Sequence, residues 1–482
     1  MTPELPLLIG GKWQTPAATA FGNVHNPSTG EIIARVPLCG AAEVDAAVQA
    51  ARKAFTAWSQ TPAPKRATVL FRYRNLIETH LEELAQLVTR ENGKTLDEAR
   101  GDVRRGFEVV EFACGIAHLQ KGESLPQVAE NIDAVTMREP LGVCAGIAPF
   151  NFPAMVPMWM YPIAIACGNA FILKPSEKVP LTAIRLAELF IEAGLPEGVF
   201  SIVHGGAAVV DALCTHPGIA AVSFVGSSRI AAHVYALGSQ HGKRVQAGGG
   251  AKNFQIVMAD AEPEPTIRAI MGASFGCAGQ RCMAGSVLLG VGEAAEPLQR
   301  RLIAAMDALK VDDTSANPAA EMGPVIDAGS RQRILGFIER ADAHLLRDGR
   351  QGIPSRGFFV GPTLFDGMIT QEEIFGPVLA MQRFATLDEA IASANQSAFG
   401  NGATLFTTSG KHARQFTREV QCGMIGINVG VPAAMAYFPF SGWNQSFYGD
   451  LHMQGSEGVQ FYTRQKVVLS RWDATYRRQQ GW

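Results

Sequence analysis

Residues 141–148 read Leu141-Gly-Val-Cys-Ala-Gly-Ile-Ala148, a short apolar run that opens a regular alternation of strands and helices. Further apolar runs follow at 170–173, 199–203 and 220–225, with helical stretches between them at 154–167, 181–193 and 206–215. Strands that alternate with helices in this way form parallel βαβ units. The stretch therefore predicts an α/β fold with a doubly wound sheet, in which ligands bind beyond the carboxyl ends of the strands.

The segments before this alternation have a different pattern. Residues 7–36 alternate short apolar runs with Gly, Asn and Pro, which predicts hairpins. Apolar residues at helical spacing predict helices through 65–116, interrupted by Asn92-Gly-Lys-Thr95. The polar, turn-containing segment 118–140 predicts a projecting hairpin.

A second alternating region follows the first, from Phe254 to about residue 440. The run Gly458-Val-Gln-Phe-Tyr-Thr-Arg-Gln-Lys-Val-Val468 near the end predicts a terminal strand. A chain of 482 residues is long enough for two or three domains with a large core.

Composition excludes several classes of protein. Lys and Arg total 42 against 44 Asp and Glu, and without a dominant basic field we expect no nucleic-acid partner. The apolar run at 152–173 is broken by prolines and glycines, so it indicates core and no membrane partner. Eight cysteines and ten histidines are scattered without ligand spacing, which predicts no metal site, no disulfide framework and a cytoplasmic location.

One thiol lies in a setting that suits chemistry. The stretch at 272–286 reads Gly272-Ala-Ser-Phe-Gly-Cys-Ala-Gly-Gln-Arg-Cys-Met-Ala-Gly-Ser286, and its small residues let a substrate approach Cys282 closely. A thiol becomes a nucleophile when nearby cations or a helix N-terminus lower its pKa. The alternative is that Cys282 is a small buried apolar residue, the commoner role of cysteine.

Four polar motifs fall where ligands of such a fold would bind. Asn151, in Pro149-Phe-Asn-Phe-Pro153, offers a neutral donor for a developing oxyanion, although turns commonly contain Asn. Lys174 and Glu177 end the next strand and could take ribose hydroxyls, or form a solvated loop pair. The remaining two motifs are Phe224-Val-Gly-Ser-Ser228, a strand-to-helix turn that could bind a pyrophosphate, and Glu373-Ile-Phe-Gly-Pro377, whose Glu could equally be an exposed loop acid.

Together these motifs resemble those of the NAD(P)-dependent aldehyde dehydrogenase superfamily over nearly the whole chain, with Phe275-x-x-x-Gly-Gln-x-Cys282 as its nucleophile motif. The resemblance implies that Cys282 is the nucleophile and Asn151 part of the oxyanion hole. It implies a cofactor site made by Phe150, Lys174, Glu177, Gly226, Ser227, Glu373 and Phe375. Glu177 would repel a 2′-phosphate, which favours NAD over NADP.

The same resemblance predicts the domains. We expect a Rossmann-type NAD-binding domain from 1–117 and 141–250, and an α/β catalytic domain from 251–440. Residues 118–140 and 455–482 would form a small β element for oligomerisation. A homo-oligomer, dimer or tetramer, is expected.

A departure from the family pattern indicates the branch. Hydrolytic members resemble ELGGK where this chain has Gly248-Gly-Gly-Ala-Lys252, and no acid lies between Gln240 and Asp260. Without the Glu that activates water, a more acidic thiol is the better acyl acceptor. Several segments, among them Pro149–Pro180, Gln280-Arg-Cys-Met283 and Pro439-Phe-Ser-Gly-Trp443, most resemble those of the coenzyme A-acylating methylmalonate-semialdehyde dehydrogenase branch, and the missing Glu agrees with that branch. The resemblance implies oxidation of methylmalonate or malonate semialdehyde with loss of CO2, which gives propanoyl-CoA or acetyl-CoA.

The substrate carboxylate of that branch needs a cation. Arg105 and Arg281 match the positions with this role, although Arg104 is a neighbouring alternative and each could be structural. Two rival functions stay open, a hydrolytic semialdehyde dehydrogenase and a non-catalytic protein with this fold.

Overall fold

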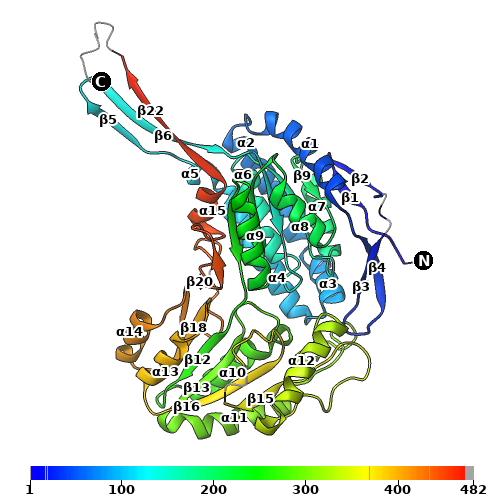
Figure 1. The fold of residues 1–482 in the computed structure, drawn as a ribbon, viewed down its shortest axis with the longest axis vertical. Helices are drawn as coiled ribbons and strands as arrows, with labels where there is room; N and C mark the ends of the chain where they lie inside the picture. Colours follow the sequence, from blue (N-terminus) through cyan, green and yellow to red (C-terminus); the bar gives the residue numbers. More distant parts are fainter. Residues whose placement is uncertain (1, 17, 19, 368–369, 434, 473–482) are drawn as a thin grey trace.

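The computed structural model describes residues 2–16, 18, 20–367, 370–433 and 435–472. Two α/β bodies follow one another along the long axis, and a narrow β element projects from the first of them (Figure 1). The predicted α/β fold class is confirmed.

The first body is built on an eight-stranded sheet with the order β2-β1-β9-β8-β7-β10-β11-β21, in which β21 is the short strand Phe447–Tyr448. Its parallel strands are β7 (Val143–Ile147), β8 (Ala170–Lys174), β9 (Phe200–Ile202), β10 (Ile219–Val225) and β11 (Arg244–Gly248). The connecting helices are α6 (Met155–Ala166), α7 (Leu181–Glu192), α8 (Ala207–Thr215) and α9 (Ser228–Gln240). The predicted alternation is confirmed. For β7 to β10 and α6 to α8, whose bounds the sequence predicted, each boundary lies within two residues of its expected position.

Both faces of this sheet are buried, as a doubly wound fold requires. Successive residues of β8 point to opposite faces: Phe171 and Leu173 join one apolar cluster, whereas Ala170 and Ile172 join another. A strand buried on both sides is a continuous apolar run, which explains why it was visible in the sequence.

The predicted break in the N-terminal helices lies at Gly93. The helices are α1 (Ala41–Trp58), α2 (Ala63–Thr79), α3 (Leu81–Asn92), α4 (Leu96–Cys114) and α5 (Ile116–Leu119). Gly93 ends α3 with φ +85°, and a Cβ atom there would lie 2.7 Å from the Pro324 side chain, so only glycine fits. Thr95 then begins α4 with a capping box that it shares with Glu98.

The second body is built on a seven-stranded sheet with the order β14-β15-β16-β13-β12-β18-β19. The strands are β12 (Asn253–Val257), β13 (Gly285–Val291), β14 (Leu345–Arg347), β15 (Thr363–Asp366), β16 (Val378–Phe384), β18 (Gly402–Phe406) and β19 (Met424–Ile427). The helices are α10 (Pro263–Phe275), α11 (Ala295–Ala308), α12 (Ala328–Arg340), α13 (Leu387–Asn395) and α14 (Gly410–Glu419).

The N-terminal segment forms the predicted hairpins. Strands β1 (Leu7–Ile9) and β2 (Lys12–Gln14) pair with each other and extend the first sheet beside β9. Strands β3 (Phe21–His25) and β4 (Ile32–Pro37) form a separate antiparallel pair.

The projecting element contains three antiparallel strands, β5 (Ser124–Ala129), β6 (Ile132–Pro140) and β22 (Thr463–Arg471), with β6 in the middle (Figure 1). The expected strand at 458–468 was wrong in its first part, because Gly455–Phe461 is the helix α15. Gly458 and Val459 are buried there, and a Cβ atom on Gly458 would lie 3.2 Å from the Ile163 side chain of α6. Packing against α6 therefore favours a helix.

The domain boundaries given above stay a prediction, and residues 473–482 lie outside the described part of the chain. No helix within that part is long and apolar enough to cross a membrane.

Candidate active site

The predicted site residues come from loops that follow the carboxyl ends of neighbouring strands. Asn151 follows β7, Lys174 ends β8, and Gly226 follows β10, so strand order in the sheet brings their loops to one edge. Cys282 reaches the same region from the second body, in the loop between the 3-10 turn Gly276–Gly279 and β13. The site therefore lies where the two bodies meet.

The backbone of the Cys282 loop is tightly constrained. Gly279 has φ +69°, and a Cβ atom there would lie 2.1 Å from the carbonyl oxygen of Gly376, so this approach of two loops requires glycine. The carbonyl oxygen of Cys282 accepts hydrogen bonds from Asn253 Nδ2 at 2.9 Å and Asn401 Nδ2 at 3.0 Å. These contacts fix the main chain that carries the thiol.

Cys282 differs in accessibility from the other cysteines. All eight are free thiols, and seven are buried, whereas Cys282 is partly exposed. It lines two cavities, a small one of about 60 Å³ and a larger one of about 530 Å³. A reagent in either cavity can therefore reach this sulfur.

The surroundings of the Cys282 thiol raise its pKa. Burial is the largest cause and the carboxylate of Glu373 the second, and together they raise the pKa to about 12 although Arg281 lowers it by a smaller effect. Arg281 thus acts in the direction expected of a neighbouring cation, but burial and Glu373 outweigh it in this conformation.

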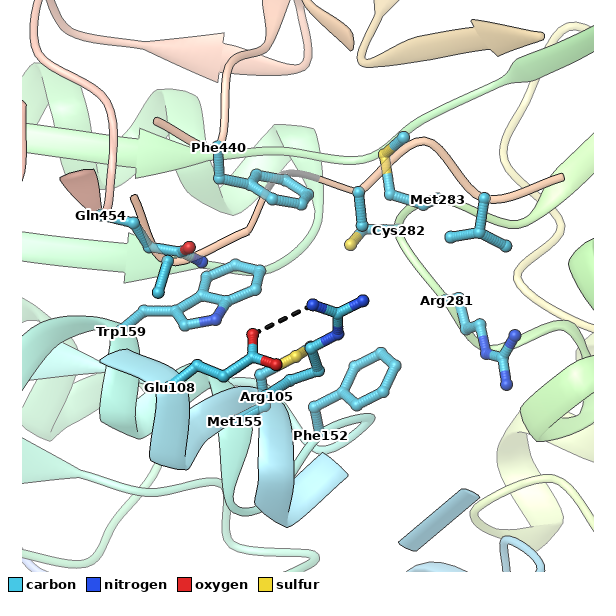
Figure 2. A pocket seen from close by; sticks show the side chains of 13 residues that line it. Arg105, Glu108, Phe152, Met155, Trp159, Arg281, Cys282, Met283, Phe440 and Gln454 are labelled. Carbon is cyan, nitrogen blue, oxygen red and sulfur yellow. Dashed lines mark hydrogen bonds and ion pairs between the residues drawn. The ribbon is translucent and has the colours of Figure 1, made fainter. Parts of the chain in front are cut away.

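The small cavity brings the two predicted arginines together with Cys282 (Figure 2). The Arg105 guanidinium points toward the cavity, and Arg104 does not line it. Arg281 turns its guanidinium away, where Nη2 lies 3.2 Å from Glu98 Oε1 and Nε lies 3.3 Å from Cys277 Sγ. Arg105 is thus the better placed of the two for a substrate carboxylate.

Sequence reasoning did not identify the other side chains of this cavity. Glu108 Oε2 lies 3.0 Å from Arg105 Nη1, one turn along α4 (Figure 2). Trp159 and Phe440 form an apolar wall, with ring centroids 4.7 Å apart. The i to i+3 spacing of Arg105 and Glu108 is visible in the sequence, but nothing there shows that the pair faces a cavity.

The larger cavity contains most of the predicted cofactor residues. Those that line it are Phe150, Asn151, Gly226, Ser227, Glu373 and Phe375, together with Cys282. The rings of Phe150 and Phe375 meet edge to face at 5.8 Å. Arg229 and Arg333, which the sequence did not single out, also line it.

Two backbone features of this cavity leave room for an anionic ligand. Ser227 is the N-cap of α9 but makes no side-chain capping bond, so the first N–H groups of this helix are available to an anion. A Cβ atom on Gly250 would lie 2.5 Å from the Glu373 carboxylate, so the backbone approaches the cavity closely there. Glu373 accepts a hydrogen bond from Ala251 N at 2.9 Å, and burial raises its pKa to about 7.

Lys174 and Glu177 lie outside the lining of this cavity. Lys174 is buried, and its ammonium donates to the carbonyl oxygens of Pro175 and Gly205 and pairs with Glu177 Oε2 at 3.2 Å. The Glu177 side chain is 42% exposed, so one face of this carboxylate is open to a ligand. Their contact with an adenosine ribose stays a prediction.

Gly248 leaves the position of the water-activating acid without a carboxylate. Gly248 ends β11, and a Cβ atom there would meet only Val225 and the Phe224 carbonyl, at 3.6 Å or more. The acids that line the larger cavity are Glu372 and Glu373. In the described residues, no group of three or more His, Cys, Asp or Glu side chains could hold a metal ion.

Comparison with known proteins gives the class of the chain. The model of the aldehyde dehydrogenase family matches residues 13–468, so the chain belongs to the aldehyde dehydrogenase family. This confirms the family predicted from the motifs.

Particular relatives are close along their whole length. The chain is 52% identical over 478 residues to the malonate-semialdehyde dehydrogenase of Halalkalibacterium halodurans, covering 97% of this chain and 98% of that protein. It is 51% identical to malonate-semialdehyde dehydrogenase 2 of Geobacillus kaustophilus, covering 96% and 98%.

Solved structures of two relatives have closely similar folds. The methylmalonate-semialdehyde dehydrogenase from Oceanimonas doudoroffii has a TM-score of 0.96 and 44% identity, covering 98% of this chain and 99% of that one. A putative methylmalonate-semialdehyde dehydrogenase from Sinorhizobium meliloti 1021, complexed with NAD, has a TM-score of 0.96 and 43% identity, with the same coverage.

Proposed function

We propose that this protein oxidises malonate or methylmalonate semialdehyde with NAD, releases CO2, and transfers the acyl group to coenzyme A. The observation that carries the proposal is the position of Cys282, whose side chain lines both a dinucleotide-sized cavity and a small cavity with a cationic wall. The names of its relatives support the substrate class.

Cys282 Sγ would attack the aldehyde carbon from the junction of the two cavities. The oxygen of the resulting hemithioacetal develops negative charge, and the Asn151 amide, which lines the larger cavity, is a neutral donor for it. The backbone N–H of Cys282 is the second donor of this oxyanion hole. One such donor contributes about 3–4 kcal/mol to other acyl-transfer reactions.

Bound NAD supplies the hydride acceptor for this oxidation. The open first turn of α9, at Gly226 and Ser227, would hold its pyrophosphate. Phe150 and Phe375 would border the nicotinamide, and Glu373 would take hydroxyls of the ribose next to it. Lys174 and Glu177 would take the adenosine ribose, where the exposed Glu177 carboxylate disfavours a 2′-phosphate.

The thioester on Cys282 would be released by a thiol rather than by water. Gly248 carries no carboxylate to activate water, whereas a thiol supplies its own nucleophilic anion near neutral pH. Coenzyme A is therefore the proposed acyl acceptor. Arg105 would orient the substrate carboxylate before it is lost as CO2, with Arg281 in an auxiliary position.

Measuring NADH formation from malonate semialdehyde with and without coenzyme A tests this function. The proposal requires steady turnover only with coenzyme A, together with acetyl-CoA as product. Equal turnover without coenzyme A would indicate a hydrolytic dehydrogenase, and no NADH under either condition would indicate a non-catalytic protein.

The proposal extends to the setting of the enzyme. Eight free cysteines suit a reducing, cytoplasmic compartment. The projecting element leaves Met137, Val467 and Leu469 exposed, as a sheet that pairs with a second copy would. A homo-oligomer is therefore expected, with a cross-linking or light-scattering measurement as its test.

A further inference from the structure

The loop that carries Asn151 rests on the turn between α3 and α4. Asn92 Nδ2 donates to the carbonyl oxygen of Phe150 at 2.9 Å, and Lys94 Nζ donates to the carbonyl oxygen of Asn151 at 2.8 Å. Two consecutive peptide groups of the loop are thus held from one side. This is the same Asn-Gly-Lys-Thr turn that interrupts the helical pattern in the sequence.

A fully buried ion pair completes the support. Lys94 Nζ lies 2.9 Å from Asp102 Oδ2, both side chains have 0% exposure, and Asp102 Oδ1 accepts from Met155 N at 2.7 Å. The ammonium also lies 4.0 Å above the ring of Phe152. The pair therefore contacts the loop at Asn151, at Phe152 and at Met155.

Such a pair is a poor device for stability alone. Removing two charges from water costs several kcal/mol, and apolar residues of similar volume often stabilise a core equally well. A buried pair does impose one geometry, because each charge must keep its partner. Its contacts with the Asn151 loop indicate which geometry it imposes.

The same helix end also holds the loop of the nucleophile. Glu98 Oε1 accepts from Cys277 N at 2.6 Å and pairs with Arg281 Nη2 at 3.2 Å. One turn of α4 separates Glu98 from Asp102. The start of α4 thus contacts both loops from which the oxyanion hole is made.

We propose that Asn92, Lys94 and Asp102 are positioning residues that set the place of the Asn151 amide relative to Cys282. The inference rests on the proposed role of Asn151 as an oxyanion donor. Catalytic donors must be held within about 0.5 Å of their productive position. Releasing the loop from these contacts should therefore lower the catalytic rate even though Asn151 itself is still present.

A double-mutant cycle tests the inference. The variant Lys94→Met/Asp102→Asn removes both charges together, so no unpaired charge is left buried. We expect kcat to fall by about 10–100-fold while the KM for NAD stays within about twofold, because the donor supplies up to 10²–10³-fold. In an Asn151→Ala background the same change should lower kcat by less than about threefold, since no donor is left to misplace.

Glu91→Gln is the control for a merely structural effect. Glu91 is equally buried and accepts from the first N–H groups of α7, at Leu181 and Thr182, but makes no hydrogen bond to the Asn151 loop. It should leave kcat unchanged even where it shifts the Tm.

Each outcome decides the matter. Equal losses of kcat in the two backgrounds overturn the positioning role, whereas an unchanged kcat in Asn151→Ala alone overturns the proposed oxyanion hole first. Should the Lys94→Met/Asp102→Asn variant fail to fold, Asn92→Ala allows the same double-mutant cycle without changing a charged residue. Additivity of Asn92→Ala with Asn151→Ala would then refute the inference.

Discussion

Replacing Arg105 by Leu gives the sharpest test of how the small cavity selects its substrate. A β-carboxylated aldehyde and propanal differ mainly by one negative charge, and Arg105 is the cation whose guanidinium points into the cavity (Figure 2). Leu keeps an apolar stem on α4 and removes only the guanidinium. The variant should therefore weaken the acidic substrate selectively.

The expected magnitude follows from the contacts of Arg105. A hydrogen bond to a charged group contributes about 1.5–3 kcal/mol, which corresponds to about 10–150-fold in kcat/KM. Arg105 is already paired with Glu108 at 3.0 Å, and the two side chains are 42% and 34% exposed. Because the substrate must compete with Glu108 and with water, we expect the low end, about tenfold.

The assay compares kcat/KM for malonate semialdehyde and for propanal, each with NAD and coenzyme A. Arg104→Leu is the matched control, since Arg104 is exposed on the same helix and does not line the cavity. Glu108→Gln is the converse change, and it should raise the preference for the acidic substrate by freeing Arg105. Equal losses with both aldehydes in Arg105→Leu, shared by Arg104→Leu, would refute the assignment.

Further predictions concern the thiol, the cofactor and pH. Cys282→Ala should abolish NADH formation, whereas Cys277→Ala, a change at a buried thiol, should retain it. The reverse result would indicate that Cys277 is the nucleophile. Glu373→Gln should speed iodoacetamide alkylation of Cys282 at pH 8, because the Glu373 carboxylate raises the thiol pKa; an unchanged rate would contradict this. NAD should give a higher kcat/KM than NADP, and Glu177→Ser should reduce the ratio of the two kcat/KM values. A ratio near one in the parent enzyme would contradict the predicted preference for NAD. Burial raises the pKa of Glu91 from 4.5 to about 7, so its contribution to stability is complete below pH 4.5 and is lost as pH rises through 7; urea midpoints should show this loss in the parent and not in Glu91→Gln.

Much of the fold could be predicted because the apolar patterns of its strands and helices are visible within short stretches of sequence. Strands buried on both faces are uniform apolar runs, so β7, β8, β9 and β10 were visible without any tertiary information. The helix Gly455–Phe461 was missed because its glycines disfavour a helix locally. Its close packing against α6, which favours the helix, is a tertiary contact that the local sequence does not show.

The site likewise has a part that the sequence predicted and a part that it did not. The motifs around Asn151 and Gly226 lie together because their strands end at one edge of the first sheet, and Cys282 and Glu373 reach the same cavity from loops of the second body. The apolar wall of Trp159 and Phe440 joins residues 281 positions apart, and no pattern in the sequence relates them.

The electrostatics of the thiol depend still more on the three-dimensional structure. Arg281 is adjacent to Cys282 in sequence, yet its guanidinium pairs with Glu98 and Cys277 and turns away from the small cavity. With that cation occupied and Glu373 lining the larger cavity, burial is the largest influence on the thiol and raises its pKa. A neutral thiol resists alkylation and oxidation, because the thiolate is the reactive form. Of the two causes that raise the pKa of Cys282, only the Glu373 carboxylate changes with pH: burial raises the pKa of Glu373 itself to about 7, so the thiol pKa should fall as Glu373 is protonated.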